Sequence, residues 1–340
     1  MRRWLFRIRG VGYACAMNAI VDPEGPKLAV LASNPVPEGV RVGWFVTPDK
    51  VRLRYAVFPK TAGAAKGTVC LVHGRTEYIE KYFETIADLQ KRGFNVATFD
   101  WRGQGGSDRL IPNRRLGYVR DFNDYWTDLQ SFHANILLPD CPAPYYLVGH
   151  SMGGLVSLIA ATRDRMMFDR VFLSSPMIGL GGLPFSFATM GAIGDLTSFL
   201  GLGRLPVGRS ADELPDERGF ARNPLTSDLR RYMVTVDTWR ERPDLIVAKP
   251  TLRWAGAAMH AMADAARDAF PASIRVPLFM LAAARDEVVS SSHTEQLGLR
   301  MRTGHHVVIP AAKHELFMET DAIRAQVFAA FDAFITTQSS

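Results

Sequence analysis

The feature that most constrains this chain is the run Gly149-His150-Ser151-Met152-Gly153, which separates an apolar strand pattern from an apolar helix pattern. Four apolar residues, 145–148, precede the run, and residues 155–163 continue as a buried helix pattern. The two glycines let the helix pass close to the strand, and the sharp turn between them pushes the serine hydroxyl outward at the strand end. The motif therefore predicts a strand, a tight turn and a helix that together expose Ser151 as a candidate nucleophile.

The rest of the chain predicts an α/β fold. Alternating side chains indicate an antiparallel hairpin, after which strand and helix patterns alternate along the chain. The hairpin is expected over 41–46 and 51–57, later strands over 68–72, 95–99, 145–148, 170–173, 276–281 and 306–309, and helices over 77–92, 122–136, 155–163, 229–240, 292–302 and 322–336. Such alternation is typical of a mostly parallel sheet covered by helices on both faces, with the hairpin at its edge.

The alternation stops for a long stretch between two of the expected strands. We interpret residues 177–262 as a cap inserted over the carboxyl ends of the strands, where open α/β sheets bind their ligands. The core then comprises residues 39–176 and 263–338, and residues 1–38 form an N-terminal tail and linker. Within the cap, residues 179–203 are rich in glycine and large apolar side chains, so we expect a mobile lid.

Composition narrows the classes of protein and of partner. With 340 residues, 47% hydrophobic and 22% charged, the chain is an ordinary globular protein, and its three cysteines indicate neither a disulfide framework nor a zinc site. The net charge of +6 comes without a nucleic-acid module, so we expect no nucleic acid partner. Four arginines among apolar residues in 1–9 suggest a peripheral contact with an anionic membrane, and a signal peptide is the alternative. We expect a cytoplasmic protein, peripheral at the inner membrane surface.

A serine nucleophile needs a neutral imidazole to take its proton and a carboxylate to orient that imidazole. His314 follows the strand expected at 306–309, and Asp286 follows the strand expected at 276–281, so both lie at carboxyl ends of strands. Glu287 is the local alternative for the acid. The backbone N–H groups of Met152 and Arg75 are expected to form an oxyanion hole for the developing negative charge.

Five motifs together resemble the α/β-hydrolase superfamily. They are Val-His-Gly at 72–74, Asp-Trp-Arg-Gly-Gln-Gly-Gly-Ser at 100–107, Gly-His-Ser-Met-Gly-Gly at 149–154, Asp-Glu-Val-Val at 286–289 and Lys-His-Glu at 313–315. Within that superfamily the chain is similar to the bacterial lysophospholipase and monoacylglycerol lipase group, also called serine aminopeptidase-like hydrolases. The cap segments 223–232 and 250–254 look like the lysophospholipase branch, and the resemblance covers roughly residues 34–338.

The resemblance implies an α/β-hydrolase fold in which Ser151 is the nucleophile, Asp286 and His314 are its partners, and Arg75 and Met152 provide the oxyanion hole. It implies hydrolysis of one acyl ester on a lysophospholipid or monoacylglycerol, through an acyl-enzyme and without a metal or organic cofactor. On this reading the lid offers Phe185, Phe187 and Phe199 to an acyl chain, or these residues simply pack the cap. Arg114 and Arg115 are candidates for binding a phosphate head group, or they form a solvated basic loop.

Other activities are weighed against this one. Epoxide hydrolases and dehalogenases share the fold but need a carboxylate nucleophile, which Ser151 argues against. A proline-type aminopeptidase would need acidic cap residues to hold the substrate amine, and Asp212, Glu213, Asp216 and Glu217 keep that alternative open. A general carboxylesterase also stays open. A non-catalytic binding protein on the same fold would have a broken triad, whereas the three residue types are all present here.

Overall fold

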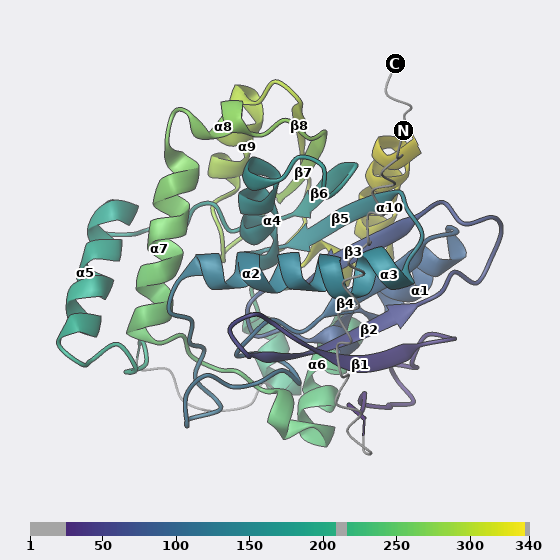
Figure 1. Ribbon diagram of the computed structural model, residues 1–340, viewed down its shortest axis with the longest axis horizontal. Helices are drawn as coiled ribbons and strands as arrows, with labels where there is room; N and C mark the ends of the chain where they lie inside the picture. The colour runs from purple at the N-terminus through teal and green to yellow at the C-terminus, as the bar shows by residue number, and fades with distance from the viewer. Residues whose placement is uncertain (1–24, 209–215, 337–340) are drawn as a thin grey trace, which may run out of the picture.

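The computed structural model describes residues 25–208 and 216–336, and it contains one eight-stranded sheet (Figure 1). The strand order is β1-β2-β4-β3-β5-β6-β7-β8. The strands are β1 (Arg41–Val46), β2 (Arg52–Phe58), β3 (Thr68–Val72), β4 (Asn95–Phe99), β5 (Tyr145–His150), β6 (Arg170–Ser174), β7 (Leu278–Ala283) and β8 (Gly304–Ile309). Strand β2 runs antiparallel to both β1 and β4, and the other pairs are parallel. The prediction of a mostly parallel sheet with an antiparallel hairpin at its edge is confirmed. The basic segment 1–9 lies outside the described residues.

Two apolar layers cover the sheet because successive side chains of a strand point to opposite faces. In β3, Cys70 and Val72 pack into one layer, and Val69 and Leu71 pack into the other. The first layer contains side chains of α2 (Phe122–Phe132), α4 (Met152–Arg163), α7 (Leu252–Ala266) and α9 (Ser291–Arg300). The second contains side chains of α1 (Phe83–Lys91) and α10 (Asp321–Thr336). Helices on both faces leave the carboxyl ends of the parallel strands as the place for a site.

Several expected elements differ in their limits. The helix expected over 77–92 is a 3₁₀ turn, η1 (Ile79–Tyr82), followed by α1. It begins later than expected because the N–H groups of Gly74 and Ile79 donate to the side chains of Glu77 and Asp100. Strand β7 begins and ends two residues later than expected, since Ala282 and Ala283 pair with β8 despite alanine's weak strand preference. Helix α2 ends at Phe132 and continues as a π-helical turn, η2 (His133–Leu137), then α3 (Leu138–Asp140).

The described part of the segment between β6 and β7 holds several helices, of which only the one over 229–240 was expected. They are α5 (Phe187–Phe199), η3 (Glu217–Arg222), α6 (Leu229–Glu241), η4 (Pro243–Leu245), α7 and α8 (Phe270–Ser273). Helix α5 lies beside α7 at the outer edge of the molecule (Figure 1), and a Cβ at Gly194 would come within 2.5 Å of Gly256 Cα. The expected cap boundary at residue 262 falls inside α7, and the division into core and cap remains a prediction. Among the described helices, none combines the length and hydropathy needed to cross a membrane.

A buried ionic network fixes the chain between β2 and the turn after β4. The Arg54 guanidinium contacts Glu80 at 2.7 Å and Asp100 at 2.6 Å, and all three side chains are buried. Asp100 also accepts hydrogen bonds from the N–H groups of Ile79 and Gly106. Burial acts to raise the pKa of Asp100, but the Arg54 charge, the contact with His73 and the Gly106 N–H together outweigh it and bring that pKa down to about 2. The network therefore ties η1 to the turn that follows β4.

We expect Arg54→Gln to destabilise the protein by about 3–5 kcal/mol, because it leaves two buried carboxylates without their cation. Urea unfolding at neutral pH measures the loss. The control is Arg300→Gln, which removes an exposed guanidinium paired with the exposed Asp268 and should cost less than about 1 kcal/mol. Equal losses for the two variants would contradict a stabilising role for the buried network.

Candidate active site

The turn at Ser151 joins β5 directly to α4 in an unusual backbone conformation. Ser151 has φ 51° and ψ −115°, a combination that costs an L-residue strain unless its neighbours enforce it. A Cβ at Gly153 would lie 2.6 Å from the carbonyl oxygens of Val72 and His73, and a Cβ at Gly149 would lie 2.5 Å from Ser157 Oγ. Only glycine fits these two positions, so α4 starts close against β3 and the serine hydroxyl points away from the helix.

The structure brings three predicted residues into one hydrogen-bonded line. Ser151 Oγ lies 3.0 Å from His314 Nε2, and His314 Nδ1 lies 2.8 Å from Asp286 Oδ2. Asp286 follows β7 and His314 follows β8, so the parallel strands deliver both residues to the end of the sheet where β5 delivers the serine. Glu287, the alternative acid, is exposed and lies outside this line.

The surroundings of Asp286 keep it ionised. Its Oδ1 accepts hydrogen bonds of 2.9 Å from the N–H groups of Val288 and Val289. Burial acts to raise the pKa of Asp286, but the hydrogen bond and charge of His314, together with the two N–H groups, hold that pKa below its usual value. An ionised carboxylate accepts from His314 Nδ1–H, which leaves Nε2 free to accept the proton of Ser151.

The two backbone groups expected in the oxyanion hole flank the serine. Met152 is the first residue of α4, and Arg75 follows Gly74, where a Cβ would lie 3.2 Å from Ser151 Cβ. Within the described part of the chain, neither N–H donates to an intramolecular acceptor. Gln104 steadies this region, because its Oε1 accepts from Thr76 N–H and its Nε2 donates to Met152 Sδ. The role of the Arg75 and Met152 N–H groups as an oxyanion hole remains a prediction.

Sequence reasoning missed a buried cluster behind His314. Lys81 Nζ lies 2.9 Å from Glu77 and 2.5 Å from Glu315, and the His150 ring centroid lies 4.8 Å from that of His314. Glu77 also accepts from Gly74 N–H, so the cluster supports the turn that carries Arg75. The spacing of Glu77 and Lys81 by four residues was a signal for their pairing. No short sequence pattern indicates that Lys81 also contacts Glu315.

The predicted substrate-binding residues lie at different depths. Phe187 packs beside the His293 ring, with centroids 5.8 Å apart, whereas Phe185 and Phe199 are 58% and 88% exposed. Arg114 and Arg115 are exposed on the loop after β4. The contacts of these residues with substrate remain predictions.

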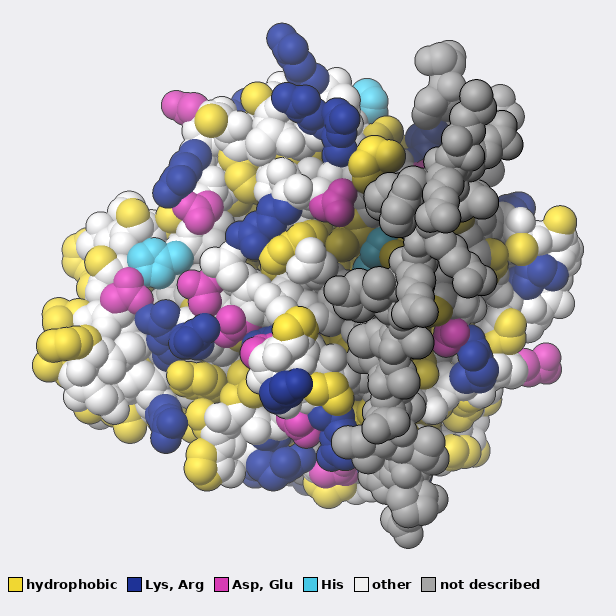
Figure 2. Space-filling model, in the orientation of Figure 1, with side chains coloured by type: hydrophobic (Ala, Val, Ile, Leu, Met, Phe, Trp, Pro, Cys, Tyr) yellow, Lys and Arg dark blue, Asp and Glu magenta, His cyan; other side chains and the backbone are white. Residues whose placement is uncertain are grey.

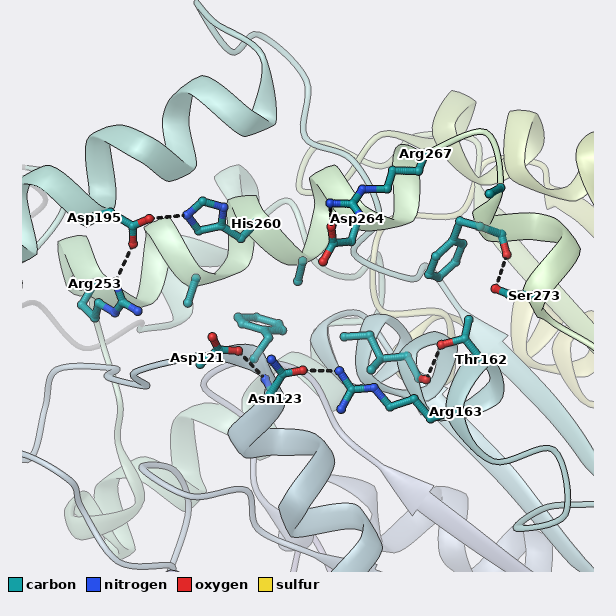
Figure 3. A pocket seen from close by; sticks show the side chains of 16 residues that line it. Asp121, Asn123, Thr162, Arg163, Asp195, Arg253, His260, Asp264, Arg267 and Ser273 are labelled. Carbon is teal, nitrogen blue, oxygen red and sulfur yellow. Dashed lines mark hydrogen bonds and ion pairs between the residues drawn. The ribbon is translucent and has the colours of Figure 1, made fainter.

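A cavity of about 590 Å³ lies apart from the serine, between α2, α4, α5, α7 and α8 (Figure 3). Most of its charged side chains pair with one another: Asp195 contacts both His260 and Arg253, and Arg267 contacts Asp264. Because none of the three aligned residues lines it, we do not assign the chemistry to this cavity. Over the described ranges, no cluster of three or more His, Cys, Asp or Glu side chains is arranged to hold a metal ion.

Acid should weaken the fold through His150. Burial lowers the pKa of His150 from 6.5 to about 3, so below pH 6.5 the unfolded chain takes up a proton that the folded protein does not. The free energy of unfolding should therefore fall with pH in this window, by up to about 1.4 kcal/mol per pH unit from this group. We expect His150→Asn to flatten this slope in urea unfolding between pH 6.5 and 4.5.

The control for that measurement is Val156→Ala, which removes buried apolar volume and no titratable group. It should lower the free energy of unfolding at every pH and keep the wild-type slope. An unchanged slope in the His150 variant would contradict the assignment of a neutral, buried imidazole.

Comparisons with known proteins agree with this geometry. The family profile described as serine aminopeptidase, S33, matches residues 63–321. Lysophospholipase L2 of Escherichia coli is 30% identical over 315 residues, covering 87% of each chain, and a probable lysophospholipase L2 of Haemophilus influenzae is 27% identical over 290 residues, covering 85% of this chain and 90% of that one. A soluble variant of monoglyceride lipase from Saccharomyces cerevisiae, solved with a substrate analogue, superposes with a TM-score of 0.67 at 20% identity, covering 87% of this chain and 95% of that one, and supports the α/β-hydrolase fold. The chain therefore belongs to the serine aminopeptidase S33 family of α/β hydrolases.

Proposed function

We propose that the protein is a serine hydrolase that cleaves the carboxylic ester of a mono-acylated lipid, a lysophospholipid or a monoacylglycerol, through an acyl-enzyme. The observation that carries the proposal is the unbroken line from Ser151 through His314 to Asp286, with contacts of 3.0 and 2.8 Å. The relatives named lysophospholipase and monoglyceride lipase support the substrate class. A non-catalytic binding protein would have no need of this line.

The first step forms the acyl-enzyme. His314 Nε2 takes the Ser151 proton as the oxygen attacks the ester carbonyl, and Asp286 stabilises the resulting imidazolium. The N–H groups of Arg75 and Met152 receive the negative charge that develops on the carbonyl oxygen. His314 then gives its proton to the departing glycerol oxygen. The alcohol leaves and the acyl group stays on Ser151.

The second step releases the fatty acid. Water enters in place of the alcohol and loses a proton to His314 Nε2 as it attacks the acyl-enzyme carbonyl. The same two N–H groups hold the new oxyanion, which collapses to free acid and Ser151 with its hydroxyl restored. Both half-reactions use one imidazole as base and then as acid, so the residues in line account for the whole cycle without a further group.

The proposed cap would provide the surface for the acyl chain. Helix α5 and the residues around it expose Ile193, Leu196 and Leu200 besides Phe185 and Phe199, and Figure 2 shows apolar side chains along the edge of the molecule where α5 lies. An exposed apolar group of this size is typical of a surface that meets a partner or a lipid. Phe187 lies deeper, beside His293. We propose that this surface receives substrate, with Arg114, Arg115 and the basic N-terminal segment outside the described residues favouring anionic interfaces.

An aminopeptidase activity is less well supported. Of the four acidic cap residues that could hold a substrate amine, Asp212 and Glu213 lie outside the described residues. Asp216 caps η3 by accepting from Gly219 N–H, and Glu217 is exposed. Close to Ser151 the turn instead carries the cationic side chain of Arg75, which would repel a substrate ammonium.

Replacing Ser151 or His314 by Ala should lower kcat by about a million-fold, because the three residues act as a unit. Asp286→Asn should lower it by about 10⁴-fold, because the amide favours the wrong imidazole tautomer. Hydrolysis of monoacylglycerol and lysophosphatidylethanolamine measures both effects, and labelling by a fluorophosphonate tests the nucleophile directly.

Glu287→Gln is the matched control for Asp286→Asn, since it neutralises the adjacent carboxylate, which is exposed. It should retain nearly full activity. A silent Asp286→Asn variant beside an inactive Glu287→Gln variant would overturn the assignment of the acid.

Phe199→Ser tests the apolar surface of α5 without disturbing the core, because this ring is 88% exposed. It should raise KM for a long-chain monoacylglycerol by up to about tenfold through lost apolar contact. KM for a soluble acetate ester should not change. Leu299→Ser, which removes a 78% exposed side chain on α9, is the control and should affect neither substrate. Equal losses on the two esters would show that Phe199 supports the fold instead.

A further inference from the structure

The guanidinium of Arg75 lies in the fold without a carboxylate partner. Over residues 25–208 and 216–336, four arginines have fully buried side chains, and each of them contacts a carboxylate at 2.6–2.7 Å. These pairs are Arg54 with Asp100, Arg102 with Asp128, Arg231 with Glu84 and Arg324 with Asp88. In the described part of the chain, no Asp or Glu lies within ion-pair distance of Arg75. A partly buried cation without a counter-charge is costly, which points to a partner that arrives from outside.

The contacts of Arg75 leave one edge of its guanidinium available. Nη1 donates to the Ala248 carbonyl at 3.0 Å, and Cζ lies 5.5 Å from the centre of the Trp254 ring. The Trp254 indole is itself fixed, because its Nε1 donates to Tyr125 Oη at 3.0 Å. Nε and Nη2 have no acceptor among the described residues. These two groups form the fork that donates parallel hydrogen bonds to a phosphate or carboxylate.

Arg75 stays charged despite its burial. Burial lowers its pKa to about 10, which is below the usual value for arginine but well above neutral pH. Arg109 has a pKa lowered to about 10 for the same reason, but its guanidinium already donates to the carbonyl oxygens of Ser107, Arg114 and Asp244. Arg109 is therefore satisfied by backbone, whereas Arg75 retains an open fork.

The backbone of Arg75 lies at the proposed site of ester cleavage. Its own N–H is one of the two groups proposed to hold the ester oxygen, and Gly74 before it lies against Ser151. Its side chain extends from that turn towards Ala248, which lies between η4 and α7, and towards Trp254 in the first turn of α7. In a lysophospholipid, a glycerol unit lies between the ester and the phosphate. The number of bonds across it is similar to the number between the backbone N–H of Arg75 and its guanidinium. One residue can therefore contact both ends of the head group.

We propose that the Arg75 side chain binds the phosphate of the substrate head group and so makes this enzyme prefer a lysophospholipid to a neutral monoacylglycerol. The inference rests on the proposed function, because it concerns the same site. The chemistry it requires is a phosphate ester anion, which forms a charge-assisted, two-pronged contact with the open edge of the guanidinium. A monoacylglycerol presents a hydroxyl there and gains no such contact.

Steady-state kinetics of Arg75→Gln test the proposal with two substrates of the same acyl chain. For lysophosphatidylethanolamine, kcat/KM should fall by about tenfold to a hundredfold, the loss expected for a hydrogen bond to a charged group. For monoacylglycerol the fall should be much smaller, because its free hydroxyl makes no charge-assisted contact with the side chain, whereas any disturbance of the oxyanion turn would lower kcat/KM for both substrates equally. Arg75→Lys should recover part of the loss, since it keeps the charge but not the fork. Arg300→Gln, which removes an exposed positive charge on α9, is the control and should affect neither substrate.

A binding measurement separates this inference from the proposed function. In the Ser151→Ala variant, sn-glycerol 3-phosphate should bind more tightly than inorganic phosphate, and adding Arg75→Gln should abolish the difference. That readout holds even if the wild-type protein cleaves neither lipid, an outcome that would refute the proposed function alone. Equal binding of the two anions would identify free phosphate as the ligand and overturn the head-group assignment.

The kinetic outcomes also discriminate. Parallel losses on both lipids would assign Arg75 to the shape of the oxyanion turn and overturn the proposal, as would no loss on either. A loss seen in Arg114→Gln and absent from Arg75→Gln would move the phosphate contact to the exposed loop after β4, and would equally refute it.

Discussion

The strained turn at Ser151 is the constraint on which the rest of the site depends. A serine at φ 51° is stable only because β5 and α4 hold it from both sides, and α4 can do so only by starting against the carbonyls of Val72 and His73. That close approach joins the start of α4 to the end of β3. The turn after β3, which carries Arg75, and the first N–H of α4 therefore both lie beside the serine.

Buried ion pairs fix the turns that surround the serine. Arg54 joins β2 to η1 and to the turn after β4, and Lys81 joins η1 to the residue after His314. Each ion is desolvated, so each is stable only with its partners in place, which penalises alternative arrangements of the turns. His150 lies between these charges and the reacting imidazole as a neutral ring. The result is a rigid polar support on the side of His314 away from solvent.

Sequence patterns predicted the fold class and the residues in line because both follow from local rules. Parallel strands end at one edge, so Ser151, Asp286 and His314 could be placed by the strands that precede them. The limits of β7 were less accessible, since Ala282 and Ala283 enter the strand only through pairing with β8. The contact of Lys81 with Glu315 spans 234 positions, and the lack of a partner for Arg75 is a property of the whole fold. No short stretch of sequence indicates either the Lys81–Glu315 contact or the missing partner of Arg75.

The glycine contact between α5 and α7 affects how the proposed cap can move. Ser151 is only 8% exposed. Where Gly194 meets Gly256, two backbones touch with no side chains interlocked between them. Helices that interdigitate resist displacement along their axes, whereas smooth surfaces slip past one another at little cost in packing. Elsewhere along this contact the His260 ring packs against Gly191, and Asp195 pairs with both Arg253 and His260. Sliding α5 along α7, a shear rather than a hinge, therefore requires these side-chain contacts to break, while no interlocked side chains oppose it at Gly194.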